Sequence, residues 1–200
     1  PFSACTQLTE INVDEANPYF SSLDGVLTDK NRTTIVAYPA GKGKRYIIPD
    51  GITKIGTHSF FACPITYIHT PNSVKTIELF AFASCTDLDT IILGNSVDSI
   101  EGAAFRINDR LKTIYSMNPI PPAAHPEAFS SFSPMFFIQC TLYVPVGSLQ
   151  AYKNAEVWKN FKNIVENDFT GIERPSPDKA KIFGNKNSIS FRNIEPGTDI

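Results

Sequence analysis

The sequence predicts a mainly β fold with short helical or irregular turns, in which repeats of about 22–23 residues coil into a right-handed solenoid. A Val/Ile-x-x-Ile segment recurs at residues 52–55, 74–77 and 97–100, with starts 22 and then 23 residues apart. A phenylalanine and then a second apolar pair follow each segment at nearly the same step. Repeats of this length with leucine or isoleucine at these spacings are typical of leucine-rich repeat solenoids. The phenylalanines are Phe60, Phe82 and Phe105, and the second pairs are Ile65/Ile68, Leu88/Ile91 and Leu111/Ile114.

Each repeat has a physical interpretation. The Val/Ile-x-x-Ile segment is a short extended stretch that points its apolar residues inward, and a small residue after it, such as Gly56 or Gly102, lets the chain turn. The phenylalanine then fills the interior of the coil. The second apolar pair belongs to a strand that takes its hydrogen bonds from the coils on either side, so the strands stack into a parallel sheet.

Composition limits the possible functions. The chain has 200 residues, 42% of them hydrophobic, and a formal charge of -2. It lacks the basic surplus that drives phosphate binding, so no nucleic-acid partner is expected. No stretch approaches the ~20 apolar residues that span a bilayer. Because residues 2–11 match the second half of a repeat, we expect residue 1 to lie inside an array, with any signal peptide upstream.

Residues of about 17–40 form an insertion on the edge of the solenoid. Two strands, at residues 25–28 and 33–38, are joined by a polar turn rich in Asp and Asn, which predicts a β-hairpin. The glycine- and lysine-rich residues 41–45 lack the frame and the Lys-Ser/Thr ending of a phosphate loop, so a basic surface turn is the better interpretation.

After Tyr115 the repeat pattern weakens. Residues 118–122 suggest a rigid linker, Phe129 the last interior phenylalanine, and residues 141–145 the final strand. Ser148 can serve as the N-cap of an amphipathic helix that includes Leu149, Tyr152 and Ala155 and is followed by Trp158. We therefore expect a C-terminal helical cap at about 142–166, with Trp158 packed in the cap rather than in a ligand site.

Several of these motifs together carry a resemblance to a known family. Residues 48–63, repeated at 71–85, the hairpin segment 24–27 with its Tyr38-Pro39 exit, and residues 142–148 resemble the BspA-like leucine-rich repeat family. The resemblance covers residues 1–166, the expected solenoid domain. It implies a protein secreted or displayed at the surface of an anaerobic Gram-negative bacterium, associated with the outer membrane, and adhesion to host matrix proteins or other cells. Asn108 departs from the family pattern by replacing the repeat cysteine, and residues 116–140 match poorly.

Residues 167–200 differ in composition from the solenoid. Residues 182–183 and 188–191 suggest two short strands around an Asn-Lys-Asn turn. Two interpretations stay open: a linker followed by the start of a small β-rich C-terminal module, or a loosely packed linker.

The outward positions of the stacked Leu-x-x-Ile strands form the candidate protein-binding face. The third positions of the repeats form one column and the fifth positions another, and four of these residues form a semi-apolar stripe of the kind that marks interaction surfaces. The alternative is that they only satisfy β-propensity. The third positions are Glu10, Tyr67, Thr90 and Thr113, the fifth are Asn12, His69, Ile92 and Tyr115, and the stripe is Tyr67, His69, Ile92 and Tyr115.

Three of the four cysteines share one repeat position. Cys5, Cys63 and Cys85 should stack as a column inside the coil at about 5 Å, close enough for a disulfide. Parallel stacking aligns their Cβ vectors, however, so buried free thiols are favoured. Cys140 lies off this register and is expected to be free.

The sequence contains no recognisable catalytic motif. His58, His69 and His125 fit no metal-ligand spacing, and no nucleophile elbow or paired carboxylates stand out. We therefore expect no enzyme, cofactor or metal; the open alternative is an active site whose groups converge only in the folded chain. The leading hypothesis is a non-enzymatic, secreted or cell-surface binding protein whose repeat face contacts a host matrix or bacterial surface protein, or a glycan. The alternative is a structural spacer that projects another domain and has no ligand.

Overall fold

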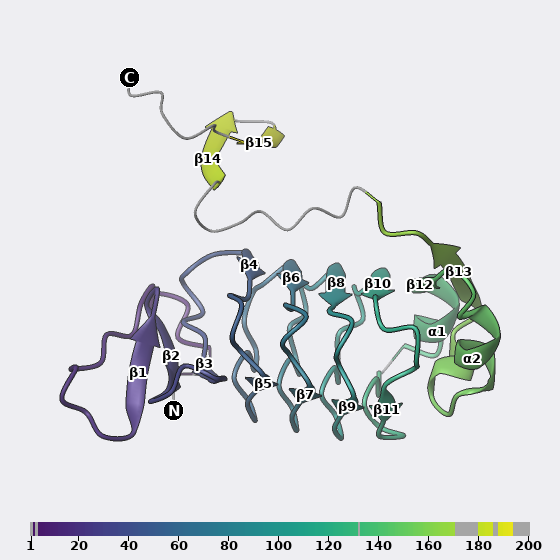
Figure 1. Ribbon diagram of the computed structural model, residues 1–200, viewed down its shortest axis with the longest axis horizontal. Helices are drawn as coiled ribbons and strands as arrows, with labels where there is room; N and C mark the ends of the chain where they lie inside the picture. Colours follow the sequence, from purple (N-terminus) through teal and green to yellow (C-terminus); the bar gives the residue numbers. More distant parts are fainter. Residues whose placement is uncertain (1, 3, 132, 171–179, 186–187, 194–200) are drawn as a thin grey trace. The chain divides into compact units, whose positions relative to one another are not determined.

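The computed structural model describes residues 2, 4–131, 133–170, 180–185 and 188–193, the last two ranges as backbone only. The chain divides into two units, Pro1–Asp168 and Phe169–Ile200. The first unit is the predicted solenoid, with one sheet along each of two opposite sides (Figure 1).

The first sheet, sheet A, holds the short strand that opens each repeat. Seven strands lie in the order β1-β2-β3-β5-β7-β9-β11, antiparallel up to β3 and parallel from β3 onward. They are β1 (Phe20–Leu23), β2 (Val26–Asp29), β3 (Thr34–Ala37), β5 (Lys54–Ile55), β7 (Thr76–Ile77), β9 (Ser99–Ile100) and β11 (Ala123–Ala124).

The second sheet, sheet B, holds the Leu-x-x-Ile strands and is parallel throughout. Its order is β13-β12-β10-β8-β6-β4, and its register aligns Ile68, Ile91, Ile114 and Leu142. These strands are β4 (Arg45–Ile47), β6 (Tyr67–His69), β8 (Thr90–Leu93), β10 (Thr113–Ser116), β12 (Thr141–Pro145) and β13 (Asn163–Asn167). The predicted repeat register is confirmed.

The predicted hairpin is present and is longer than expected. Strands β2 and β3 pair as predicted, with the Asp29 carboxylate accepting hydrogen bonds from the amides of Thr33 and Thr34 at 2.7 Å. Strand β1 was not predicted. It pairs with β2 through a two-residue turn, Asp24-Gly25, in which both residues have positive φ. Asp-Gly is a strong signal for this tight hairpin turn, and it could have identified β1.

The interior phenylalanines form one stacked column. The ring centroids of Phe60 and Phe82, Phe82 and Phe105, and Phe105 and Phe129 lie 4.9, 5.3 and 5.1 Å apart. Tyr38 extends the column by stacking on Phe60 at 4.9 Å. The spacing matches the distance between neighbouring strands because each coil contributes one ring. We call these five residues the aromatic column, and the interior position predicted for Phe129 is confirmed.

The repeat cysteines and Asn108 share one hydrogen-bonding role. The Cys63 thiol donates to the Tyr38 carbonyl at 3.8 Å and the Cys85 thiol to the Phe60 carbonyl at 3.0 Å. The Asn108 amide donates to the Phe82 carbonyl at 2.9 Å in the same way. Each of these side chains therefore satisfies the backbone carbonyl of the aromatic residue one coil earlier. Asn108 therefore replaces the repeat cysteine and keeps a hydrogen-bond donor at this position.

The turns after sheet A form a third ladder. Around Phe60, Phe82 and Phe105 the residues two before and two after the ring have positive φ, and neighbouring coils exchange bonds such as Phe60 N to Ala81 O at 2.8 Å. The chain turns directly after Gly56 and from Gly102 onward, as expected, but neither glycine has positive φ. Gly56 is required by space instead, because a Cβ there would lie 2.5 Å from the Ile35 carbonyl oxygen.

The poorly matching residues 116–140 form another coil with a longer connection. It contains β11, Phe129 and the one-turn helix α1 (Phe136–Gln139). The prediction that β12 is the final strand of the array is wrong, because β13 pairs with it in parallel. After the cap the chain is extended and pairs with the free edge of β12. The helix-like spacing of the apolar residues in this segment did not predict the strand.

The cap covers the end of the aromatic column. It consists of α2 (Leu149–Asn154) and the 3-10 helix η1 (Trp158–Asn160). Trp158 is fully buried, meets Phe129 edge to face at 5.5 Å and donates to the Pro122 carbonyl at 2.8 Å, so its packing role is confirmed. Ser148 occupies the N-cap position but makes no side-chain capping bond. Glu166 instead accepts hydrogen bonds from the amides of Gly147 and Leu149.

In the second unit, β14 (Ala180–Asn185) and β15 (Ser188–Asn193) pair antiparallel, as the two predicted strands require. Residues 171–179, 186–187 and 194–200 lie outside the described residues. The assignment of this unit as the start of a C-terminal module stays a prediction.

Removing one ring from the aromatic column should destabilise the solenoid strongly. Phe82→Ala is expected to cost about 3 to 5 kcal/mol of unfolding free energy, because a cavity would open between two stacked rings. This corresponds to a fall in melting temperature of roughly 10 °C, measured by circular dichroism. Phe20→Ala is the control, since Phe20 is 41% exposed. Equal melting of the two variants would contradict the role of the column.

The four cysteines should differ sharply in reactivity. Cys5 is exposed, whereas Cys63, Cys85 and Cys140 are buried and free, and burial raises the pKa of Cys63 and of Cys140 to about 12. One thiol should therefore react quickly with a disulfide reagent in the native protein. The other three should stay protonated and slow between about pH 7 and 9, and react only on unfolding.

Cys5→Ser should remove the fast phase of this labelling. Two or more fast thiols in the native parent would contradict the buried positions. The exposure of Cys5 also corrects the expectation that it stacks inside the coil with Cys63 and Cys85.

Candidate binding face

The outer face of sheet B is built by strand alternation. Ile68, Ile91 and Ile114 point into the core and are fully buried, so the residues on either side of them point outward. The strand register aligns these outward residues in two ladders. One ladder is Arg45, Tyr67, Thr90, Thr113 and Thr141, and the other is Ile47, His69, Ile92, Tyr115 and Tyr143.

Four of the predicted face residues lie in these ladders and keep part of their surface exposed. Tyr67 and Thr90 are neighbours across β6 and β8, and Thr113 and Tyr115 lie on β10. The structure therefore brings these four side chains together on one face.

The exposed stripe predicted between Tyr67 and Tyr115 is interrupted. His69 is only 1% exposed and Ile92 only 4%. Both stand inside their ladder, with Ile47 on one side and Tyr115 on the other, so lateral packing at the strand spacing removes accessible surface. Strand alternation gave their direction correctly but not their exposure.

Glu10 and Asn12 do not join this face. Both are exposed, but they lie in a segment without a strand, and sheet B begins only at β4. The amide of Ile11 donates to the carbonyl of Gly25 at 2.8 Å, so this segment packs on the hairpin turn rather than on the sheet. This segment therefore hydrogen-bonds to the inserted hairpin instead of to a neighbouring coil.

Two contacts define the exposed part of the face, and each includes a residue that the sequence did not point to. The Arg45 guanidinium lies 4.0 Å from the centre of the Tyr67 ring. The rings of Tyr115 and Tyr143 stack at 4.8 Å and 16°. Tyr143 follows Leu142 as Tyr115 follows Ile114, so continuing the repeat register across the weak segment would have found it.

Burial controls the ionisation of the phenols on this face. It raises the pKa of Tyr67, with Arg45 acting in the opposite direction, and it raises the pKa of Tyr115, to which Tyr143 adds. Both hydroxyls therefore stay protonated at neutral pH and can donate or accept hydrogen bonds. The face offers flat aromatic area, phenolic hydroxyls and one guanidinium, groups that can make apolar contacts and hydrogen bonds.

No three His, Cys, Asp or Glu side chains among the described residues lie close enough to hold a metal ion. The described part of the chain also contains no helix of the length and hydropathy that a bilayer crossing requires.

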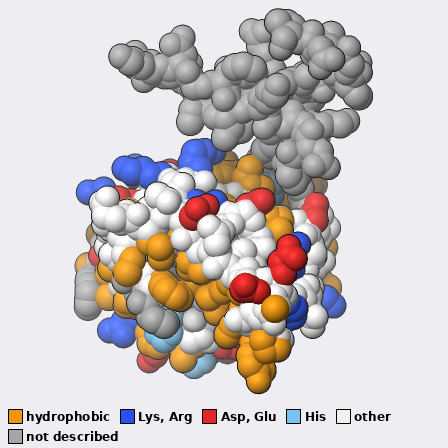
Figure 2. Space-filling view, turned by 90° about the vertical axis from the view of Figure 1, so that its left-hand side faces the viewer, with side chains coloured by type: hydrophobic (Ala, Val, Ile, Leu, Met, Phe, Trp, Pro, Cys, Tyr) orange, Lys and Arg blue, Asp and Glu red, His pale blue; other side chains and the backbone are white. Residues whose placement is uncertain are grey.

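At the N-terminal end hydrophobic side chains reach the surface beside acidic ones (Figure 2), and Tyr19 in this region is 74% exposed.

Several solved structures of bacterial proteins are similar to this chain. The pneumococcal vaccine antigen PcpA is similar at a TM-score of 0.52 and 19% identity, over 80% of this chain and 50% of that one. A leucine-rich cell surface protein from Faecalibacterium prausnitzii A2-165 aligns at 0.45 and 19%, over 83% and 44%. A leucine-rich repeat protein from Bacteroides capillosus aligns at 0.43 and 25%, over 68% and 98%. The chain thus spans about half the length of the first two.

No curated protein matches the chain. The family model for the BspA type leucine rich repeat region, in six copies, matches residues 39–143, which are more than half of the chain. This range includes four of the six strands of sheet B and four of the seven strands of sheet A in full. With the stacked coils and the repeat register, this match shows that the chain belongs to the BspA-type leucine-rich repeat family.

Proposed function

We propose that this chain is a non-enzymatic binding protein, secreted or displayed at the cell surface, that holds a partner protein on the outer face of sheet B. The pairing of Arg45 with Tyr67 and of Tyr115 with Tyr143 is the observation that carries this proposal. Tyrosine and arginine are the residue types in which binding energy concentrates at protein interfaces.

The rigidity of the face favours binding. All four of these side chains stand on strands of one parallel sheet, and each is held by a ring contact to a neighbour. Side chains that are already ordered lose little entropy when a partner arrives, so more of the contact energy appears as affinity. Thr90 and Thr113 separate the two pairs with small polar side chains, which leaves room for a partner to approach.

A protein partner fits this face best. Stacked rings offer flat apolar area, and the hydroxyls and the guanidinium offer hydrogen bonds at its edge, the mixture found at the centre of protein interfaces. The family resemblance supports a host matrix or bacterial surface protein as this partner, and an extracellular location. A glycan would use the same rings and hydroxyls and is a second outcome of the test.

The proposal predicts that the tyrosines carry the affinity. Binding of the 200-residue chain to immobilised matrix proteins, measured by surface plasmon resonance, should weaken about tenfold or more in the Tyr67→Ala/Tyr115→Ala variant. Tyr19→Ala is the matched control, because this exposed tyrosine lies outside sheet B.

Unchanged binding in the double variant would exclude the outer face of sheet B as the binding site. Failure of the parent chain to retain any matrix protein, surface protein or glycan would instead favour a spacer that only projects another domain.

A further inference from the structure

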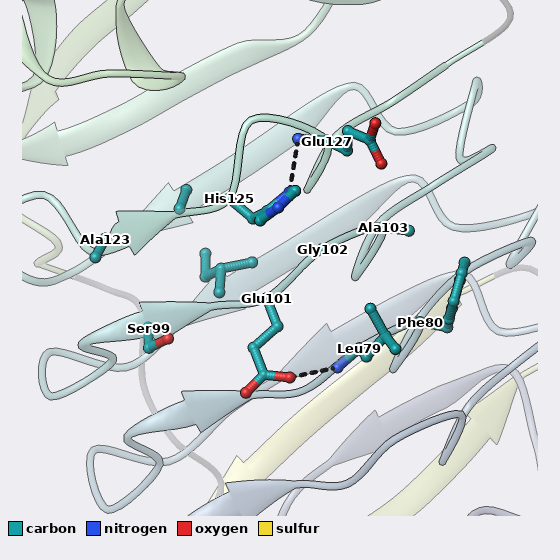
Figure 3. Close-up of a pocket in the computed structure, with 11 residues that line it drawn as sticks. Leu79, Phe80, Ser99, Glu101, Gly102, Ala103, Ala123, His125 and Glu127 are labelled. Atoms are coloured by element: carbon teal, nitrogen blue, oxygen red, sulfur yellow. Dashed lines mark hydrogen bonds between the residues drawn. The ribbon is translucent and has the colours of Figure 1, made fainter.

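A second surface feature lies on the side of the solenoid that carries sheet A. An open hollow of about 580 Å³ follows the ends of β9 and β11 (Figure 3). Leu79 and Phe80 border it on one side and His125 and Glu127 on the other, with Gly102 and Ala103 between them. Sheet B runs along the opposite side of the coils, so the hollow is separate from the face proposed above (Figure 1).

The hollow exists because one coil lacks two side chains. Counted from the aromatic column, the residues two before Phe82, Phe105 and Phe129 are Phe80, Ala103 and Glu127. The residues three before them are Leu79, Gly102 and Pro126. The middle coil therefore carries alanine and glycine where its neighbours carry larger residues. We call this gap over Ala103, between Phe80 and Glu127, the slot.

The dimensions of the slot suit one flat group. Its two sides belong to coils that are two strand spacings apart, roughly 10 Å, so one planar group can lie between them at stacking distance from each. His58 already stacks on Phe80 at 5.0 Å from the coil before. A group in the slot would continue this stack over Ala103.

The charged side chains that line the slot determine which kind of ligand it can bind. Glu101 and Glu127 are exposed carboxylates on its lining, and no Lys or Arg is among its lining residues. One Glu101 oxygen accepts the Leu79 amide at 3.0 Å, which fixes this carboxylate at the edge. His125 accepts the Glu127 amide at Nδ1, at 3.1 Å, so that nitrogen carries no proton in this arrangement. The slot thus combines an aromatic wall with a negative rim.

We propose that the slot binds an arginine side chain of a partner protein. The guanidinium is planar, lies flat on an aromatic ring and donates in parallel to a carboxylate. It would stack on Phe80 over Ala103 and donate to Glu127 across the slot, while Glu101 adds to the negative potential. A lysine ammonium lacks the planar shape, and a neutral aromatic ring would gain no charge-assisted hydrogen bond to the Glu127 carboxylate.

The backbone offers a direct way to close the slot. Phe80 and Ala103 both have a φ of 55°, so the conformation at position 103 is one in which this fold already holds a phenylalanine. Ala103→Phe should therefore extend the stack from His58 and Phe80 and occupy the space of the ligand. Glu127→Gln tests the charge at an exposed position where folding is not at risk.

Binding is measured by NMR titration of the full chain with N-acetyl-arginine amide and, separately, N-acetyl-lysine amide. The arginine probe should shift the amide signals of residues 79, 80, 102, 103, 125 and 127 and bind more tightly than the lysine probe. Ala103→Phe should abolish these shifts, and Glu127→Gln should weaken binding about fivefold or more. Glu156→Gln, an exposed change in the cap, is the matched control and should bind like the parent.

Equal binding of the two probes would overturn the proposal, since a general attraction of cations would then explain the result. Retained binding in Ala103→Phe, or in Glu127→Gln, would overturn it as well. Tyr67→Ala/Tyr115→Ala should leave these shifts unchanged, so the slot and the outer face of sheet B can fail independently.

Discussion

The distance between successive coils is the constraint on which this structure depends. Strands in a sheet lie about 4.8 Å apart, and the rings of the aromatic column lie 4.9 to 5.3 Å apart. Hydrogen bonding and ring stacking therefore demand the same spacing, and one ring per coil satisfies both. A repeat of 22 or 23 residues is the length of chain that returns to this position, so the repeat length follows from the closed coil.

The same spacing explains side chains that look like departures in the sequence. The carbonyls of Tyr38, Phe60 and Phe82 each accept a hydrogen bond from the side chain of the residue three after the next ring. A thiol and a primary amide both serve, which is why Asn108 can stand in a cysteine column. The hydrogen-bond donor is the requirement at this position, and sulfur chemistry is not, since the buried thiols stay protonated.

With the interior fixed, the two outer sides are free to differ from coil to coil. On sheet B the outward ladders are filled, and their larger side chains pair into Arg45 with Tyr67 and Tyr115 with Tyr143. On the side of sheet A, the substitution of Gly102 and Ala103 for larger residues opens a slot. Outward positions that all carry side chains make a flat face, whereas a coil with smaller side chains leaves a hollow. The solenoid can present both surfaces without a change in its core.

The spacing of residues along the chain predicted the period, the aromatic column from Phe60 to Phe129, strands β6, β8, β10 and β12 of sheet B, the hairpin of β2 and β3, and the family, but not β4. These follow from apolar spacing along the chain, and spacing is a local property. Burial, long-range hydrogen bonds and the added strand depend on contacts between coils, which the spacing along the chain does not predict. Neighbouring coils bury His69 and Ile92, the hairpin draws Glu10 and Asn12 away from the sheet, and β13 adds a strand beyond the cap. Exposure at each outward position depends on which side chains stand in the coils before and after it, and only the folded chain brings those side chains together.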